Sequence, residues 1–312
     1  MSWPIAPLPW QAELWTRISQ QVQTGRLPHA LLLTGSPDVG KRCLLQALAA
    51  SLLCANPENG IACGRCKSCQ LLMAGSHSDL LDVAPEEGGR LIKVDQIRKL
   101  ISFASQTPAL GARKIILLGP AESMNISAAN ALLKILEEPS VSTNLLLHTS
   151  SVSNLPATLR SRCQTVTHPS PASEAVLPWL AAALGAPEAE AALAAVEGQP
   201  MSAMKLGLED GVRTYTQARQ SVAALLRGEL SALELPSVVK DVALEEALLL
   251  MQRELESAIR SYSTGSNARN LREIYHLRDD LARKRRAVLA GANPNRQLLI
   301  EDYSARLQQA FR

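Results

Sequence analysis

Four cysteines in the first quarter of this sequence have the spacing of a metal site. In the pattern C-x8-C-x2-C-x2-C they are Cys54, Cys63, Cys66 and Cys69. Four thiolates complete the tetrahedral shell of a structural zinc ion, and Gly60 and Gly64 permit the turns that bring the sulfur atoms together. The sequence therefore predicts a structural Zn²⁺ site in an insertion at residues 54–69, with His77 in a surface or capping role. An iron–sulfur cluster and disulfides are the alternatives.

A second candidate site precedes the cysteines. The stretch G-S-P-D-V-G-K-R, residues 35–42, has the form of a phosphate-binding loop between a strand and a helix. Gly35 and Gly40 would let backbone N–H groups surround a phosphate, and Lys41 would neutralise its charge. Such a loop continues with Ser or Thr, whose hydroxyl binds Mg²⁺, but Arg42 stands there. The loop is degenerate: it is either only a tight turn or a residual site for nucleotide or phosphate.

The carboxylates that ATP hydrolysis needs are also missing. One carboxylate for Mg²⁺ and one to activate water would follow a neighbouring strand. After the apolar run 115–118 the sequence has Gly119 and Pro120, and Glu122 is not expected to take the place of a catalytic acid beyond that turn. Two independent losses in one site argue against hydrolysis by this chain.

The apolar pattern divides the chain into an α/β part and an all-α part. Short, purely apolar runs are typical of buried parallel strands with helices on both faces. A helix at 127–138, closed by Pro139, fits between two of them. Beyond residue 168 the sequence becomes rich in Ala and Leu with helical spacing. The predicted strands cover residues 31–34, 80–83, 115–118, 145–148 and 164–167.

Composition limits the class of protein. Hydrophobic residues make up 46% and charged residues 20% of the 312 residues, which is ordinary for a soluble globular protein. The net charge of +3 is too small to argue by itself for a nucleic-acid surface. Neither a signal peptide nor a membrane-spanning run is apparent, so we expect a cytoplasmic protein with reduced thiols.

An arginine-rich turn, Leu159-Arg-Ser-Arg-Cys163, lies between the last two predicted strands. An arginine at such a place usually forms a surface salt bridge. In ring-shaped ATPases, however, one subunit lends an arginine to the γ-phosphate bound by its neighbour. A chain without catalytic carboxylates of its own could still supply that group.

Several motifs together resemble one family. They are L-P-H-A-L at 27–31, the four cysteines, G-S-H-S-D at 75–79, N-A-L-L-K-I-L-E-E-P at 130–139, L-R-S-R-C at 159–163 and N-P-N-R-Q-L-L-I-E-D at 293–302. On these the chain resembles the clamp-loader branch of the AAA+ proteins, and within it the delta-prime subunits of bacterial DNA polymerase III. The motifs span essentially the whole chain.

The resemblance implies a fold and a division into domains. Residues 1–168 would form an AAA+ RecA-like α/β domain carrying the zinc insertion. Residues 169–207 would form a small helical lid domain, and residues 208–312 a C-terminal helical collar for oligomerisation. In active relatives the lid carries an arginine that senses the γ-phosphate, and Met201 stands at that position here.

The resemblance also implies a role. The chain would be a stator-like subunit without ATPase activity, and Ser161, Arg162 and Cys163 would form a motif acting in trans, with Arg162 as the arginine finger. Its partners would be the gamma/tau ATPase subunits and the delta subunit in a hetero-pentamer, and, through that complex, the sliding clamp and primer-template DNA. Because Gly35, Gly40 and Lys41 are retained, nucleotide occupancy stays open.

Two other interpretations use the same residues. An ATP-hydrolysing motor subunit of the gamma/tau type would share the cysteines and the Ser-Arg-Cys motif, but Arg42, Gly119, Pro120 and Met201 favour the stator. A zinc-ribbon module for DNA would need a basic or aromatic surface, yet the cysteine region contains only Arg65 and Lys67 as basic residues. The basic run 283–286 follows two aspartates, so local pairing on a solvated helix face is expected before DNA binding.

Overall fold

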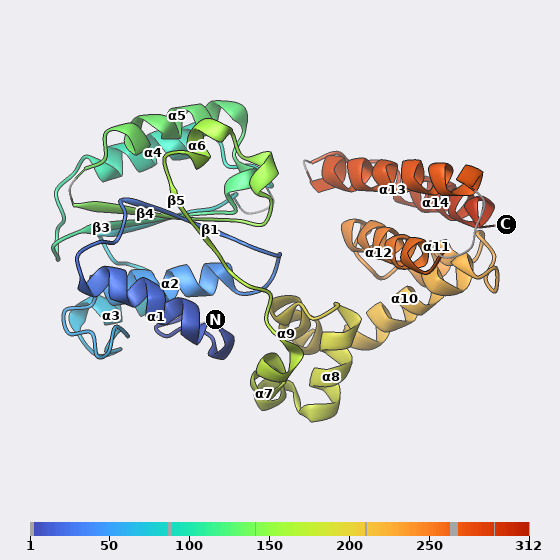
Figure 1. Ribbon diagram of the computed structural model, residues 1–312, viewed down its shortest axis with the longest axis horizontal. Coiled ribbons are helices and arrows are strands. Elements are labelled where there is room, and N and C mark those ends of the chain that lie inside the picture. The colour runs from blue at the N-terminus through green and yellow to red at the C-terminus, as the bar shows by residue number, and fades with distance from the viewer. Residues whose placement is uncertain are drawn as a thin grey trace. The chain divides into compact units, whose positions relative to one another are not determined.

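A five-stranded, wholly parallel sheet organises the first half of the chain (Figure 1). The computed structural model describes residues 3–86, 89–140, 142–209, 211–262, 268–289 and 291–311. The strand order is β2-β3-β4-β1-β5, and each strand lies where the apolar runs predicted it. The strands are β1 (Ala30–Thr34), β2 (Leu80–Val83), β3 (Lys114–Leu118), β4 (Thr143–Thr149) and β5 (Gln164–Thr167).

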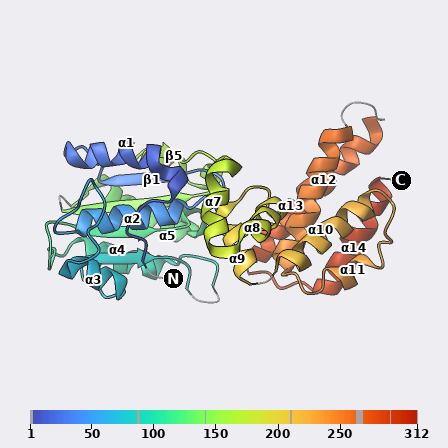
Figure 2. The ribbon, with the colours of Figure 1, turned by 90° about the horizontal axis from the view of Figure 1, so that it is seen from below.

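Helices cover both faces of this sheet, which explains why its central strands are apolar throughout. Successive side chains of a strand point to opposite faces. In β1, Leu31 and Leu33 pack with one set of helices, while Leu32 packs with the other. Figure 1 shows the first set, α1 (Ala12–Gln23), α2 (Lys41–Leu53) and α3 (Lys67–Met73), on one side of the strands, and Figure 2 views the sheet from that side. The opposite set is α4 (Val94–Ala104), α5 (Ile126–Glu137) and α6 (Ala157–Arg160).

The parallel arrangement places several chain segments at one edge of the sheet. Thr34 at the end of β1 pairs in register with Thr149 of β4 and Thr167 of β5, and Leu118 of β3 pairs with Leu147. The carboxyl ends of these strands therefore meet. The loop that follows β1, the Gly119 turn that follows β3 and the turn that follows β4 all emerge at this edge.

The remainder of the chain is helical, as predicted. Its helices are α7 (Ser173–Leu184), α8 (Ala186–Ala195), α9 (Pro200–Leu208), α10 (Val212–Leu226), α11 (Leu235–Val238), α12 (Leu244–Tyr262), α13 (Ala268–Leu289) and α14 (Arg296–Ala310). None of the helices in the described ranges is long and apolar enough to cross a membrane.

The chain divides into two compact units. One comprises Met1–Ala186 with Gly198–Ala203, and the other comprises Pro187–Glu197 with Met204–Arg312. The first unit contains the sheet and both candidate sites, while the second is helical. The three-domain division at residues 168 and 207 stays a prediction.

Candidate functional site

The four predicted metal ligands meet at one point beside the sheet. Their sulfur atoms all lie within 4.8 Å of one another. The Sγ atom of Cys66 lies 3.9 Å from that of Cys54 and 3.5 Å from that of Cys69. The backbone N–H of Cys63 donates to Cys54 Sγ at 3.3 Å. All four are free thiols, so they do not form the alternative disulfides.

Local turns produce this convergence. Cys54 directly follows α2, and Cys66 directly precedes α3. Between them Gly60 (φ +80°) and Gly64 (φ +69°) adopt the left-handed conformation that glycine allows at no steric cost. The turns predicted at both glycines are confirmed.

The surroundings of the sulfur atoms suit a metal ion. Burial by itself raises the pKa of Cys66. Hydrogen bonds from the backbone N–H groups of Cys69 and Ala55 outweigh this effect and lower the pKa to about 6. Burial instead raises the pKa of Cys69 to about 12. A cluster that already favours one thiolate, and in which a cation would relieve the cost of burying the others, could bind a metal such as zinc.

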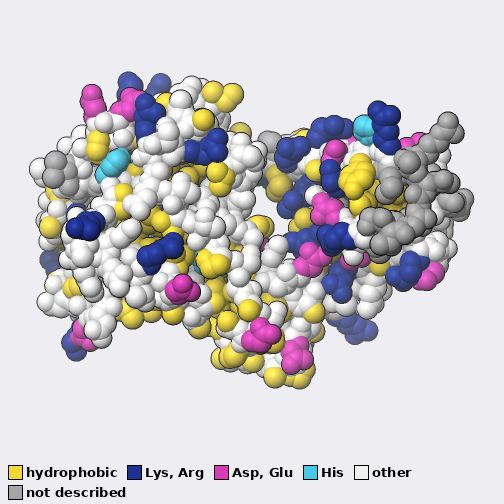
Figure 3. Space-filling view, viewed as in Figure 1, with side chains coloured by type: hydrophobic (Ala, Val, Ile, Leu, Met, Phe, Trp, Pro, Cys, Tyr) yellow, Lys and Arg dark blue, Asp and Glu magenta, His cyan; other side chains and the backbone are white. Residues whose placement is uncertain are grey.

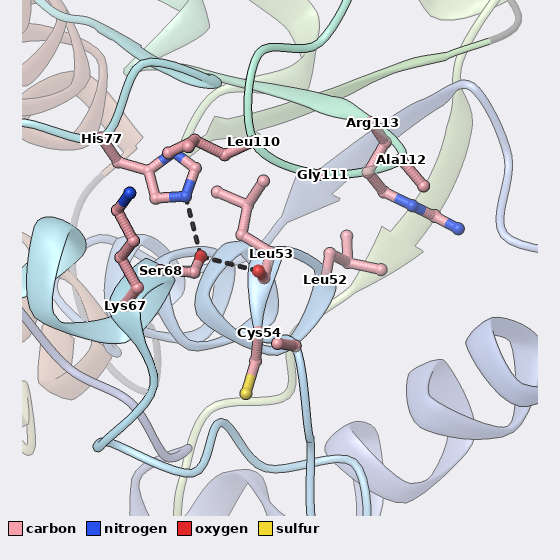
Figure 4. Close-up of a pocket in the computed structure, with 11 residues that line it drawn as sticks. Leu52, Leu53, Cys54, Lys67, Ser68, His77, Leu110, Gly111, Ala112 and Arg113 are labelled. Atoms are coloured by element: carbon pink, nitrogen blue, oxygen red, sulfur yellow. Dashed lines mark hydrogen bonds between the residues drawn. The ribbon is translucent and has the colours of Figure 1, made fainter.

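His77 lies close to the cysteine segment in the sequence, but both of its ring nitrogens form hydrogen bonds with other residues. Its Nδ1 accepts a hydrogen bond from the N–H of Asp79 (3.1 Å), so its Nε2 carries the proton and donates to the Ser68 hydroxyl (2.7 Å). Ser68 in turn donates to the Leu53 carbonyl at 2.6 Å (Figure 4). These bonds tie α3 to the end of α2 beside a cavity of about 420 Å³. The serine proton points to a carbonyl and not to the histidine, so this pair is structural. The expected surface position of His77 was wrong, since the side chain is only 6% exposed, and its Nδ1 accepts from a backbone N–H just before β2.

The phosphate-loop segment has the predicted backbone form. It connects β1 to α2, and Gly40 adopts a left-handed conformation (φ +92°) directly before Lys41. Lys41 is only 4% exposed, and its Nζ donates to the carbonyls of Gly35 and Ser36 and to the Ser150 hydroxyl. Burial lowers the pKa of Lys41, against the opposing charge of Glu122. The lysine therefore lies within the loop and satisfies acceptors of its own chain.

Arg42, which follows Lys41 in the loop, reaches β2. Its guanidinium forms an ion pair of 2.5 Å with Asp82 in β2. Burial raises the pKa of Asp82, and the neighbouring Arg42 lowers it only in part. The charge of Arg42 thus compensates that of Asp82 near the carboxyl ends of the strands.

At the end of β3 a side chain at residue 119 would require the ring of His148 to move. A Cβ atom added at Gly119 would lie 2.2 Å from Nε2 of His148. Burial, followed by the charges of Arg42 and Lys41, lowers the pKa of His148 to about 4, so this ring is neutral. Sequence reasoning noted the missing acid at residue 119 but missed the histidine that takes its space.

Glu122 is linked to the phosphate loop through Ser150. It belongs to a short 3-10 helix, η2 (Ala121–Ser123), and its Oε1 accepts a hydrogen bond from the N–H of Ser150 at 2.9 Å. The hydroxyl of Ser150 accepts a hydrogen bond from Lys41, so the carboxylate and the ammonium group both bind Ser150. The expectation that Glu122 does not take the place of a catalytic acid stays a prediction.

Two other segments, η1 (Pro9–Gln11) and α9, also form hydrogen bonds with the loop. Trp10 in η1 donates its indole N–H to the carbonyl of Val39 (2.9 Å), and its ring packs edge-on against Trp179 of α7 at 5.2 Å. Asp38 accepts a hydrogen bond from the hydroxyl of Ser202 (2.8 Å), and its carbonyl accepts one from the N–H of Met201 (3.0 Å). Met201, the residue in the position of the sensing arginine, therefore lies beside the phosphate loop.

The Ser-Arg-Cys motif follows the short helix α6. Arg162 is 35% exposed, and its guanidinium donates to the carbonyl of Thr158 (3.0 Å) and the Ser161 hydroxyl (3.4 Å). Its other terminal nitrogen forms an ion pair of 2.6 Å with Glu137. Burial raises the pKa of Cys163 to about 11, so this residue is a neutral thiol at the inner side of the motif.

The basic run of α13 has the predicted local pairing. Lys and Arg side chains gather over this helix in the space-filling view (Figure 3). Arg283 pairs with Asp280 at 3.1 Å, and Arg278 pairs with Asp279 at 2.6 Å. Asp280 also accepts from Arg306 of α14. The run is therefore partly neutralised by its own unit.

Comparison with known proteins agrees with these features. Residues 10–171 match the family described as "DNA polymerase III, delta subunit". The DNA polymerase III subunit delta' of Pseudomonas aeruginosa is 39% identical over 94% of this chain and 94% of its own length. That of Escherichia coli is 35% identical over 70% of this chain and 65% of its own length.

A solved structure shares the fold. The gamma subunit-related protein of Thermotoga maritima superposes with a TM-score of 0.50 and 22% identity, covering 97% of this chain and 100% of that one. The parallel sheet with its cysteine cluster and the similarity to known proteins point to the same family. The chain therefore belongs to the delta' family of DNA polymerase III subunits, in the clamp-loader branch of the AAA+ proteins.

Proposed function

We propose that this chain is a non-catalytic, stator-like subunit of a clamp loader that helps to load the sliding clamp onto primed DNA. In this role it supplies Arg162 to the ATP site of a neighbouring ATPase subunit. The observation that carries the proposal is a contrast within one unit. The chain's own phosphate loop lacks the groups for hydrolysis, while an arginine in the Ser-Arg-Cys motif is partly exposed on the same domain.

The absence of hydrolysis follows from three positions. Arg42 replaces the hydroxyl that would bind Mg²⁺ and pairs with Asp82. His148 occupies the space that a carboxylate at residue 119 would need. Met201 has no charge with which to bind a γ-phosphate. Repair of any one position leaves the other two defects in place.

Arg162 has the properties that a finger requires. A guanidinium stays charged at all physiological pH values and binds phosphate oxygens through fixed N–H donors. Leu159, which is fully buried, anchors the turn that carries it. In the transition state of phosphoryl transfer, charge develops on the phosphate oxygens, and an arginine from a neighbouring subunit stabilises it.

Several further assignments belong to the same proposal. The partners are gamma/tau ATPase subunits and a delta subunit in a hetero-pentamer, which contacts the clamp and primer-template DNA. The C-terminal helices 208–312 form the collar of that assembly, in the cytoplasm. The metal held by the four cysteines is Zn²⁺ with a structural role, because four thiolates leave no open coordination position.

One observation favours the alternative, an active motor subunit. Lys41 is retained, and Glu122 places a carboxylate beside it. Nucleotide binding and hydrolysis by the purified chain alone test this alternative directly. The stator proposal predicts no turnover above background, and turnover that is lost in Lys41→Ala would establish the motor.

The finger is tested in the reconstituted complex. Arg162→Ala should lower ATP turnover at the neighbouring site by about tenfold or more, since such fingers contribute factors of about 10³–10⁵ elsewhere. Arg160→Ala, which removes an exposed arginine two residues earlier, at the end of α6, is the matched control and should leave turnover unchanged. Equal turnover in both variants would refute the finger, provided that both assemble.

A further inference from the structure

The guanidinium of Arg162 is already engaged within its own chain. One terminal nitrogen donates to the carbonyl of Thr158 and the hydroxyl of Ser161, and the other contacts a carboxylate oxygen of Glu137 at 2.6 Å. Both ends of the planar fork therefore have acceptors. A guanidinium has five N–H groups, and a phosphate that approaches the Nη2 side of the fork would compete with the carboxylate of Glu137.

Glu137 has a physical reason to hold a cation. It is the last residue of α5, where unpaired carbonyl groups give the helix end a partial negative charge. A carboxylate at this end is disfavoured unless a positive group neutralises it. Arg162 lies in the turn after α6, 25 residues later in the sequence, and provides that positive charge.

The ion pair with Glu137 and a phosphate contact of the same guanidinium oppose each other electrostatically. A carboxylate within hydrogen-bonding distance of the guanidinium would also lie close to any phosphate that the same guanidinium binds, and the two anions repel. We propose that Glu137 is a latch: it holds Arg162 against α5 in the free subunit and releases it when a nucleotide-bearing neighbour docks. This inference rests on the proposed finger role of Arg162.

The ion pair between Glu137 and Arg162 is weak because solvent reaches it. The side chains are 35% and 50% exposed, and exposed ion pairs contribute little because water screens them. The ion pair therefore lowers the population of unpaired Arg162 by a factor of only about two to five. Removal of the carboxylate should raise the activity of the complex by a factor in that range and not by orders of magnitude.

The chain offers a matched control at the next position. Glu137→Gln removes the charge of the latch and keeps its shape, while Glu138→Gln makes the same change at an exposed neighbour on the same helix end. Each variant is assembled into the complex at a subsaturating concentration of this subunit, and ATP turnover is measured. Both are repeated in the Arg162→Ala background and at raised salt, which weakens an exposed ion pair.

The proposal predicts that Glu137→Gln raises turnover about two- to fivefold over Glu138→Gln. The gain should shrink at raised salt and vanish when Arg162 is alanine. Turnover that is equal in the two glutamine variants, or lower in Glu137→Gln, would overturn the latch while Arg162→Ala still inhibits. If Arg162→Ala itself has no effect, the proposed finger fails instead, so the two failures are distinguishable.

Discussion

At the scale of single residues, two side chains occupy the surroundings of the phosphate loop. The ring of His148 lies where a side chain at residue 119 would project, and Arg42 forms an ion pair with Asp82. One substitution could restore a single missing ligand. It could not also move the ring of His148, and a substitution of Arg42 would leave the carboxylate of Asp82 without its partner.

Arg42→Thr tests this view. Restoring the hydroxyl should not produce ATP turnover, since residue 119 still carries no carboxylate. It should lower the free energy of unfolding by about 1 kcal/mol, because the partly buried Asp82 loses its partner. Urea denaturation and an ATPase assay of the purified chain measure both effects.

A second substitution checks the cause of that loss. Asp82→Asn in the Arg42→Thr background should recover at least half of the lost stability, because no charge is then left unpaired. A double variant that is no more stable than Arg42→Thr would contradict the role assigned to the ion pair.

At the scale of elements, the cysteine cluster belongs to the main core. Cys54 and Cys69 are buried together with residues of β1 and α2 on one face of the sheet. The insertion therefore supports that face and is not a separate surface module. A metal that fixes the four thiolates would stabilise the whole α/β domain.

Cys66→Ser should reduce the zinc content of the purified chain to a small fraction of that of the wild type. It should also lower the melting temperature by roughly 5–10 °C, as expected for a loss of a few kcal/mol. Cys43→Ser, at a free thiol outside the cluster, is the control and should retain its zinc. Unchanged zinc content and melting temperature in Cys66→Ser would contradict the site.

The contact between α13 and α14 depends on Asp280. Although burial raises it, hydrogen bonds from Arg306, Tyr303 and Arg283 lower the pKa of Asp280 to about 2 from its ordinary 3.8. A pKa lowered in the folded state means that the stabilisation is present above about pH 4 and is lost as the pH falls towards 2.

Asp280→Asn should therefore lower the free energy of unfolding by about 1 kcal/mol at neutral pH, a value reduced by partial exposure of the side chain. The difference from the wild type should disappear near pH 2. Asp279→Asn, at an exposed aspartate paired only with its neighbour Arg278, is the control. Denaturant titrations at pH 7 and pH 2.5 measure both variants, and a difference that is constant with pH would contradict the account.

The sequence predicted elements better than it predicted contacts. The strands and the cysteine site were recoverable because buried runs and ligand spacing are local patterns. The pairing of Arg162 with Glu137 and the packing of Trp10 on Trp179 join segments far apart in the chain. The acidic residues at the end of α5 were a usable signal, since a carboxylate at that helix end needs a cation, but no local pattern shows which cation supplies it.

At the scale of the whole molecule, the chain carries a degenerate phosphate loop and, in the role proposed for it, an arginine that completes the site of a neighbour. Its own phosphate loop is held by hydrogen bonds from Trp10, Ser202 and Met201. The Ser-Arg-Cys turn lies on the same domain and carries a cation. In the proposed role the chain contributes to hydrolysis only within an assembly, and its membership of the delta' family supports that proposal.

The most direct test is single-turnover phosphate release by the reconstituted complex with Arg162→Ala in place of the wild-type chain. A finger acts on charge that develops in the transition state, so the rate of phosphate release at the neighbouring site should fall by about tenfold or more. The affinity of that site for ATP should change much less. An unchanged rate in a fully assembled complex would contradict the central claim that this subunit works through its neighbour.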